Sequence, residues 1–85
     1  MDNTEITKTE IEAFHKRVGK NVKRVRKQKG VSQLKLASLI GHDSVAHVAK
    51  AELNKYDKRF NLEHIYRISK ALDVGMDEFF KDVEE

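Results

Sequence analysis

The sequence contains no cysteine, no proline and no tryptophan, and its 85 residues include only four glycines. Without disulfides, a chain that can bury only one small core depends on close helix packing or dimerisation for its stability. The lack of cysteine also fits a reducing compartment, so we expect a cytoplasmic protein. Because proline and Ser/Gly-rich linkers are missing, residues 1–85 are predicted to form a single domain.

Long apolar runs are missing as well. No stretch approaches the roughly 20 apolar residues of a membrane span, and the acidic start, Met1 to Glu5, has neither the basic nor the apolar segment of a signal peptide. We therefore expect no membrane partner. The four histidines lack metal-ligand spacing and have no cysteine to join them, so we expect neither a metal nor a cofactor.

Charge, in contrast, is abundant and segregated along the chain. The net charge is +3. Residues 15–59 carry thirteen lysines and arginines against three acidic residues, whereas residues 1–14 and 60–85 are each net acidic. A basic middle flanked by acidic ends predicts a surface that meets the phosphates of nucleic acid. The alternative is a solvated, lysine-rich helix face.

Capping residues and glycines divide the chain into five expected helices. The first begins at Thr7, where Glu10 completes a capping box, and ends near Gly30. Its apolar side chains recur at helical spacing in one stripe, formed by Ile11, Phe14, Val18, Val22 and Val25. The N-terminal part of this stripe is either core or a dimer surface.

The later helices also have recognisable ends. The expected N-caps of the second, third and fourth helices are Ser32, Asp43 or Ser44, and Asn61. Gly41 and Asn54 tolerate a left-handed conformation and are expected to end the second and third helices. A short fifth helix is expected over residues 76–81, and no window alternates with the period of a strand. The expected fold is an all-α, compact five-helix bundle in which residues 1–6 and 82–85 are flexible.

The most informative segment is residues 32–53, which has the pattern of a helix-turn-helix motif. Two helices that cross steeply need a small residue at their contact, and Ala37 supplies it. The tight turn between them needs a residue that tolerates positive φ, and Gly41 supplies that.

The sequence resembles the Cro and phage-repressor-like (Xre-type) family of DNA-binding domains, whose fold is lambda-repressor-like. The matching segments, in order, are Val18-Gly19-Lys20, Arg26-Lys27-Gln28-Lys29-Gly30-Val31-Ser32-Gln33, Leu62-Glu63, Ile68-Ser69-Lys70-Ala71-Leu72 and Asp77-Glu78-Phe79-Phe80. The resemblance covers about residues 18–80, so the first helix extends beyond the family's usual start. Several separate motifs in the right order make it specific.

Two departures from the family pattern affect the third helix and the loop after it. An alignment without a gap would put His47 and Lys50 at the family's two buried apolar positions, which is physically poor. One extra residue in the turn instead turns Val48 and Ala51 inward and puts Glu52 at the family's acidic position, where the resemblance implies an ion pair with Arg26. The loop from Asn54 to Asn61 is also about two residues longer than usual.

In this register the resemblance implies which residues face DNA. The base-reading positions are Ser44, Val45, Ala46, His47, Ala49 and Lys50. Within this set, Val45 and Ala46 offer methyl contacts, while His47 and Lys50 are the candidate hydrogen-bond donors. The expected phosphate contacts are Ser32, Gln33, Lys55, Lys58 and Arg59.

The resemblance implies a sequence-specific, double-stranded DNA-binding regulator, most simply a repressor that binds a two-fold site as a homodimer. An antitoxin or accessory subunit whose main partner is another protein is the alternative. We do not expect an enzyme, because no catalytic cluster is present. His42, Asp43 and Ser44 are the residue types of a hydrolytic triad, but adjacent residues cannot converge as a triad requires.

Overall fold

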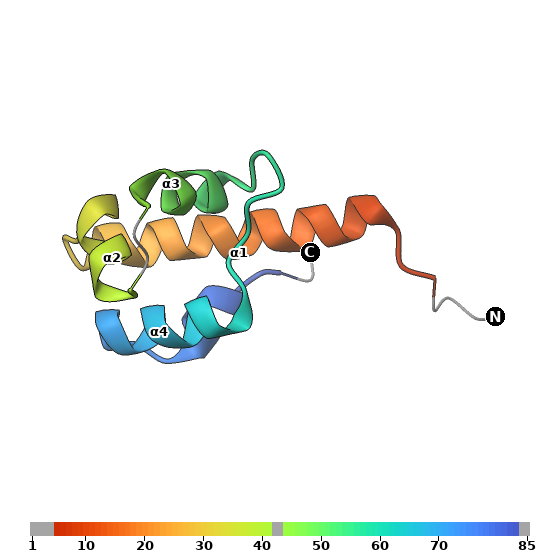
Figure 1. Cartoon of the computed structure of the whole chain (residues 1–85). Helices are drawn as coiled ribbons and strands as arrows, with labels where there is room; N and C mark the ends of the chain where they lie inside the picture. The colour runs from red at the N-terminus through yellow and green to blue at the C-terminus, as the bar shows by residue number, and fades with distance from the viewer. Residues whose placement is uncertain (1–4, 42–43, 84–85) are drawn as a thin grey trace.

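The computed structural model describes residues 5–41 and 44–83, which form four α-helices and one 3-10 helix and include no strand (Figure 1). The elements are α1 (Lys8–Gln28), α2 (Gln33–Leu39), α3 (Val45–Leu53), α4 (Leu62–Leu72) and the 3-10 helix η1 (Met76–Phe80). Within these residues no helix combines the length and apolar character needed to cross a membrane. His42, Asp43 and most of the tails expected to be flexible (residues 1–6 and 82–85) lie outside the described residues.

The expected fifth α-helix needs correction, because residues 76–80 form a 3-10 helix. Gly75 precedes this helix and provides no side-chain cap, and only five residues are available before the backbone becomes extended at Lys81. Short, weakly capped segments commonly adopt the tighter 3-10 winding. The bundle therefore consists of four α-helices closed by a 3-10 turn.

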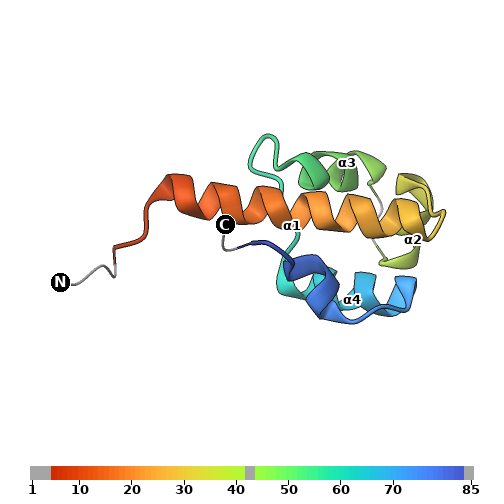
Figure 2. The ribbon, with the colours of Figure 1, turned by 180° about the vertical axis from the view of Figure 1, so that it is seen from behind.

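Helix α1 is the central element of the domain. It begins with the expected capping box, in which the Thr7 hydroxyl accepts from the Glu10 backbone N–H and the Glu10 carboxylate accepts from the Thr7 backbone N–H. Figures 1 and 2 show α3 along one side of α1 and α4 with η1 along the other, while the first turns of α1 project beyond the other helices.

The core lies where the apolar stripe of α1 meets the inner faces of the other helices. Its fully buried side chains are Val22, Val25, Leu36, Val48, Ile65, Ile68 and Phe79. All five elements contribute to this set, so no helix is stable by itself and each is positioned by the others. In the first part of the stripe, Val18 is buried, whereas Ile11 and Phe14 are 42% and 36% exposed.

A glycine allows α3 to approach α1 closely. A Cβ atom at Gly19 would lie 2.5 Å from the carbonyl oxygen of Ala51 and 2.6 Å from that of Glu52. Real Cβ atoms do not come this close to backbone oxygens, so only glycine fits at this position. Gly19 therefore sets the distance between α1 and the helix that carries the candidate recognition face.

The helix ends follow the capping residues of the sequence. The side chains of Ser32, Ser44 and Asn61 accept hydrogen bonds from the first turns of α2, α3 and α4. Gly41 has a φ of 73° after α2, and Asn54 has a φ of 52° after α3. These local signals fix where α3 begins and ends, and therefore which of its residues can reach a ligand.

Candidate nucleic-acid interface

Helix α3 has the register that requires one extra residue in the preceding turn. Val48 and Ala51 are 0% and 1% exposed, and Glu52 is also buried. Val45, Ala46 and Lys50 are exposed to solvent. The helix thus turns its apolar side to α1 and α2 and presents a face of small side chains and one lysine.

A buried ion pair joins α3 to α1. The Arg26 Nε and Nη2 atoms donate to the two carboxylate oxygens of Glu52 at 2.7 and 3.1 Å. Only 8% of the Arg26 side chain and 0% of the Glu52 side chain are exposed. Gln33 at the start of α2 adds a third hydrogen bond, from Nε2 to Glu52 Oε1 at 2.9 Å. A fourth bond, from Arg26 Nη1 to the Val31 carbonyl at 2.9 Å, connects the network to the loop before α2.

This network holds the two helices of the motif in one geometry. A bidentate arginine–carboxylate pair is both directional and charge-assisted, and it is strongest where water is excluded. Glu52 receives donors from α1 and α2, so the angle of α3 to both helices is fixed by the same carboxylate. A rigid α3 is what a surface that reads another molecule requires.

The candidate base-reading residues divide into exposed and half-buried groups. Val45 is 39% exposed, and Ala46 and Lys50 are also exposed. The Lys50 Nζ lies 5.5 Å from the ring centroid of Tyr56, an arrangement typical of a cation–π contact. Ser44 is half-buried, and its Oγ caps the helix by accepting from the His47 backbone N–H at 3.2 Å. Lys50 is therefore the one long polar side chain fully on the exposed face of α3.

His47 lies at the edge of this face. Its ring is half-buried and meets the ring of His64 from α4 edge to face, with centroids 5.6 Å apart. His64 in turn packs edge to face on Phe60, at 6.2 Å. Ala49 is half-buried on the other edge of the face. The structure therefore places the six predicted base-reading residues on α3 and at its N-cap, and gives His47 a packing contact that the sequence pattern did not indicate.

The predicted phosphate contacts are similarly divided. Ser32, Lys55 and Lys58 are exposed. The Gln33 side chain is turned toward Glu52, which uses one of the two hydrogens on its amide nitrogen. Arg59 is half-buried, and its Nε is buried without a hydrogen-bond partner among the described residues. Lys55 and Lys58 are thus the exposed cations of this set.

Arg59 lies close enough to α1 to act on His15. Burial lowers the pKa of His15 below its usual value, and the positive charge of Arg59 lowers this pKa further. The Arg59 side chain is thus partly packed against the protein and partly exposed to solvent. The loop before α4 therefore lies close to His15 in the N-terminal part of α1.

The loop after α3 contains a feature that the sequence analysis missed. Tyr56 and Asp57 both have positive φ, of 55° and 58°. Non-glycine residues seldom adopt this conformation, so the loop has a specific shape. It leaves Tyr56 77% exposed between the two exposed lysines of the loop, Lys55 and Lys58. An aromatic residue within a short basic loop is a signal that could have identified Tyr56 as a candidate contact.

Comparison with known protein families shows to which family the chain belongs. A helix-turn-helix family model matches residues 22–79. The chain belongs to the Cro/C1-type helix-turn-helix family. Proteins of this family are DNA-binding transcriptional regulators, and the match includes α2, α3 and the side chains of the buried ion pair.

A solved structure supports the same assignment. The helix-turn-helix chain is 31% identical to the restriction-modification controller protein C.AhdI from Aeromonas hydrophila, with a TM-score of 0.68. The match covers 76% of this chain and 94% of the controller protein. A search of curated protein sequences gave no match. The family model begins at Val22, so the first two-thirds of α1 precede the matched segment.

Proposed function

We propose that this regulator binds double-stranded DNA sequence-specifically, with α3 in the major groove, and that a homodimer represses transcription by occupying a two-fold site. The observation that carries the proposal is the exposed face of α3, which is fixed to α1 and α2 by the buried Arg26–Glu52–Gln33 network. Its small side chains allow close approach to base edges, and Lys50 supplies a donor for guanine O6 or N7.

Phosphate contacts on either side of α3 would set its orientation. Ser32 and Gln33 lie at the start of α2, where backbone N–H groups favour an anion. Lys55 and Lys58 lie in the loop beyond the other end of α3. Contacts to both strands of the groove would place Lys50 between them.

The dimer is proposed because α3 has only nine residues and reads few base pairs alone. The exposed part of the apolar stripe is a candidate surface for the second copy. The Phe14 ring stacks on Phe80 with centroids 6.4 Å apart, next to the exposed Ile11. Site occupancy is the simplest mode of repression, because it needs no surface besides those for DNA and the second copy.

The experiment begins with selection of a binding site from a randomised duplex library. Affinities of the parent, Lys50→Ala, His47→Ala and Lys55→Ala proteins are then measured on the selected duplex and on a scrambled duplex at one salt concentration. Lys50→Ala should weaken binding to the selected duplex by about 1–3 kcal/mol and leave the scrambled duplex almost unchanged. Lys55→Ala is the matched control for a phosphate contact and should weaken both duplexes alike.

Two results would contradict the proposal. If selection enriches no sequence, the protein does not read bases. If Lys50→Ala keeps the parent's ratio of specific to non-specific affinity, the exposed face of α3 does not carry the readout. His47→Ala shows whether the half-buried ring contributes, and size-exclusion chromatography with and without the selected duplex tests the dimer.

A further inference from the structure

Helix α1 carries an unusual concentration of positive charge. Its residues 13–28 include seven lysines and arginines and no acidic residue. Four of them, Lys16, Lys20, Lys23 and Lys27, are separated by four, three and four positions and therefore share one side of the helix. We call these four residues the lysine row.

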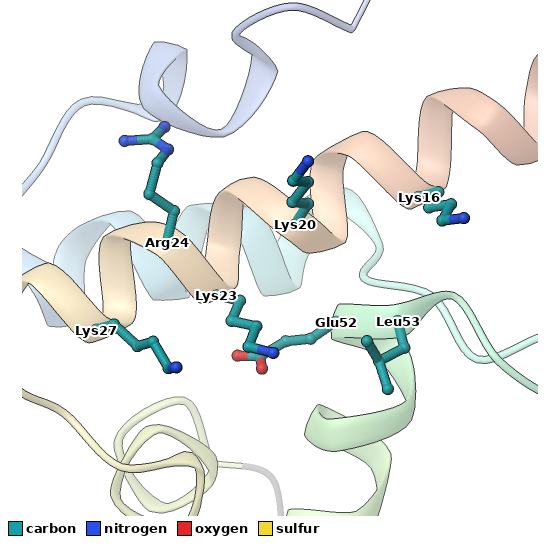
Figure 3. Close-up of a pocket in the computed structure, with 7 residues that line it drawn as sticks. All are labelled: Lys16, Lys20, Lys23, Arg24, Lys27, Glu52 and Leu53. Atoms are coloured by element: carbon teal, nitrogen blue, oxygen red, sulfur yellow. The ribbon is translucent and has the colours of Figure 1, made fainter.

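The lysine row borders a groove between α1 and α3, shown in Figure 3. The groove has a volume of about 490 Å³. Lys23 and Lys27 point into the space between the two helices, and Leu53 and Glu52 face them from α3 (Figure 3). Leu53, the last residue of α3, is 47% exposed, so this wall of the groove reaches solvent at the end of α3.

The charge of the row is not neutralised within the part of the chain that the structure describes. The ion pairs found there are Arg24–Glu78, Lys81–Glu78, Arg26–Glu52 and Arg67–Glu63, and none includes a member of the row. Glu52, the acidic residue of the groove, already accepts hydrogen bonds from Arg26 and Gln33. Arg24, which also lines the groove, donates to the Glu78 carbonyl and is paired with its carboxylate.

An unneutralised row of this spacing destabilises the free protein. Like charges three and four residues apart on a helix repel one another, and the row contains three such neighbouring pairs. The repulsion disappears when an extended anion lies along the row. Lys27 lies eleven positions after Lys16, which corresponds to about 16 Å along the helix axis. A DNA strand presents one phosphate about every 3.4 Å along its axis, so the row could face several of them.

We propose that the lysine row binds the phosphate backbone of the duplex that α3 enters, outside the base pairs that α3 reads. The inference rests on the proposed DNA-binding function and extends its contact surface from α3 to α1. Continuity supports a single duplex, because Leu53 of α3 forms one wall of the groove. Lysine side chains bind phosphate as flexible point charges, so the row would add affinity without selecting sequence.

The test compares two variants with the same change in net charge. The row variant is K16Q/K20Q/K23Q/K27Q. The matched control, K8Q/R67Q/K70Q/K81Q, removes four charges outside the groove. Binding to a random-sequence 30-bp duplex is followed by fluorescence anisotropy at several salt concentrations. Each lost phosphate contact should reduce the slope of log affinity against log salt by about 0.9, so the row variant should lose up to about 3.6 and the control almost nothing.

Protein integrity is checked by thermal melting. The row variant should melt no lower than the parent because like-charge repulsion is removed, so weaker DNA binding cannot be assigned to unfolding. If the row variant and the control have equal slopes, the inference is overturned. If the row variant binds DNA like the parent but no longer self-associates in sedimentation, the row binds an acidic segment of a second copy, which also overturns it.

The test of the lysine row can fail independently of the test of base reading by α3. A parent that binds no duplex removes both proposals. A reduced slope for the row variant with an unchanged specificity ratio for Lys50→Ala supports the row and contradicts base reading by α3. An unchanged slope for the row variant with a reduced specificity ratio for Lys50→Ala supports base reading by α3 and contradicts phosphate binding by the row.

Discussion

Replacing Glu52 by alanine should destabilise the domain more than any substitution of an exposed charge. The Glu52 carboxylate is fully buried and accepts three hydrogen bonds, two from Arg26 and one from Gln33. The alanine variant leaves the buried Arg26 guanidinium with its bond to the Val31 carbonyl and without its counter-charge. It also leaves a cavity where the carboxylate was, between three helices.

The magnitude follows from the burial of the pair. Removing one partner of a buried ion pair costs about 3–5 kcal/mol, because the remaining charge stays out of water without compensation. A domain of this size has a total stability of only about 5–10 kcal/mol. Each kcal/mol shifts the melting temperature of such a domain by about 4–8 °C, so Glu52→Ala should melt about 12 °C or more below the parent.

The assay is thermal and urea unfolding followed by circular dichroism. Glu63→Ala is the matched control, because Glu63 pairs with Arg67 at 3.0 Å on the surface, where both side chains are more than half exposed. Loss of that pair should cost less than about 1 kcal/mol. Glu52→Ala melting within a degree of the parent would refute the reasoning. A double substitution, Arg26→Leu with Glu52→Leu, should be less destabilised than either single change.

Two further predictions concern α1. Gly19→Ala should destabilise the domain by about 1–3 kcal/mol despite the better helix propensity of alanine, because the new methyl group meets the Ala51 and Glu52 carbonyls. Lys20→Ala, measured by the same thermal melts, is the exposed control and should melt no lower than the parent. The pKa of His15 is lower in the folded state than in the unfolded state, so protonation of His15 favours unfolding. The contribution of His15 to the free energy of unfolding is therefore constant above about pH 6.5 and decreases as the pH falls below that value. His15→Gln should therefore lose less melting temperature than the parent between pH 7 and pH 5; an equal loss in both would show that His15 is not the group responsible.

The helix boundaries could be predicted because their signals are local. Thr7 with Glu10, Ser32, Ser44 and Asn61 act as caps through residues at most three positions away, and such contacts need no knowledge of the rest of the fold. The last element was misjudged because it has only five residues and no side-chain cap at Gly75, so its winding depends on how it packs on α1 and α4.

The candidate site was less predictable because its side chains respond to distant neighbours. His47 is predicted to donate to base edges, and the structure adds a contact that the sequence did not indicate, because His64, seventeen positions later, packs against its ring. Gln33 was expected to be available to phosphate, but Glu52 accepts a hydrogen bond from its amide. Arg59 is predicted to contact phosphate, and the structure places it half-buried and close to His15 of α1. Each of these contacts joins residues from different helices or loops.

The position of α3 is what connects stability to recognition in this domain. A nine-residue helix is not stable alone, so α3 depends on the close approach at Gly19 and on the buried Arg26–Glu52 pair. Both contacts lie on the side of α3 opposite to Lys50, and neither is exposed to a ligand. A substitution that loosens them moves the exposed face relative to the lysine row, and the two surfaces that we propose to contact one duplex must keep a fixed spacing. Loosening these buried contacts should therefore weaken the sequence-specific DNA binding that we propose.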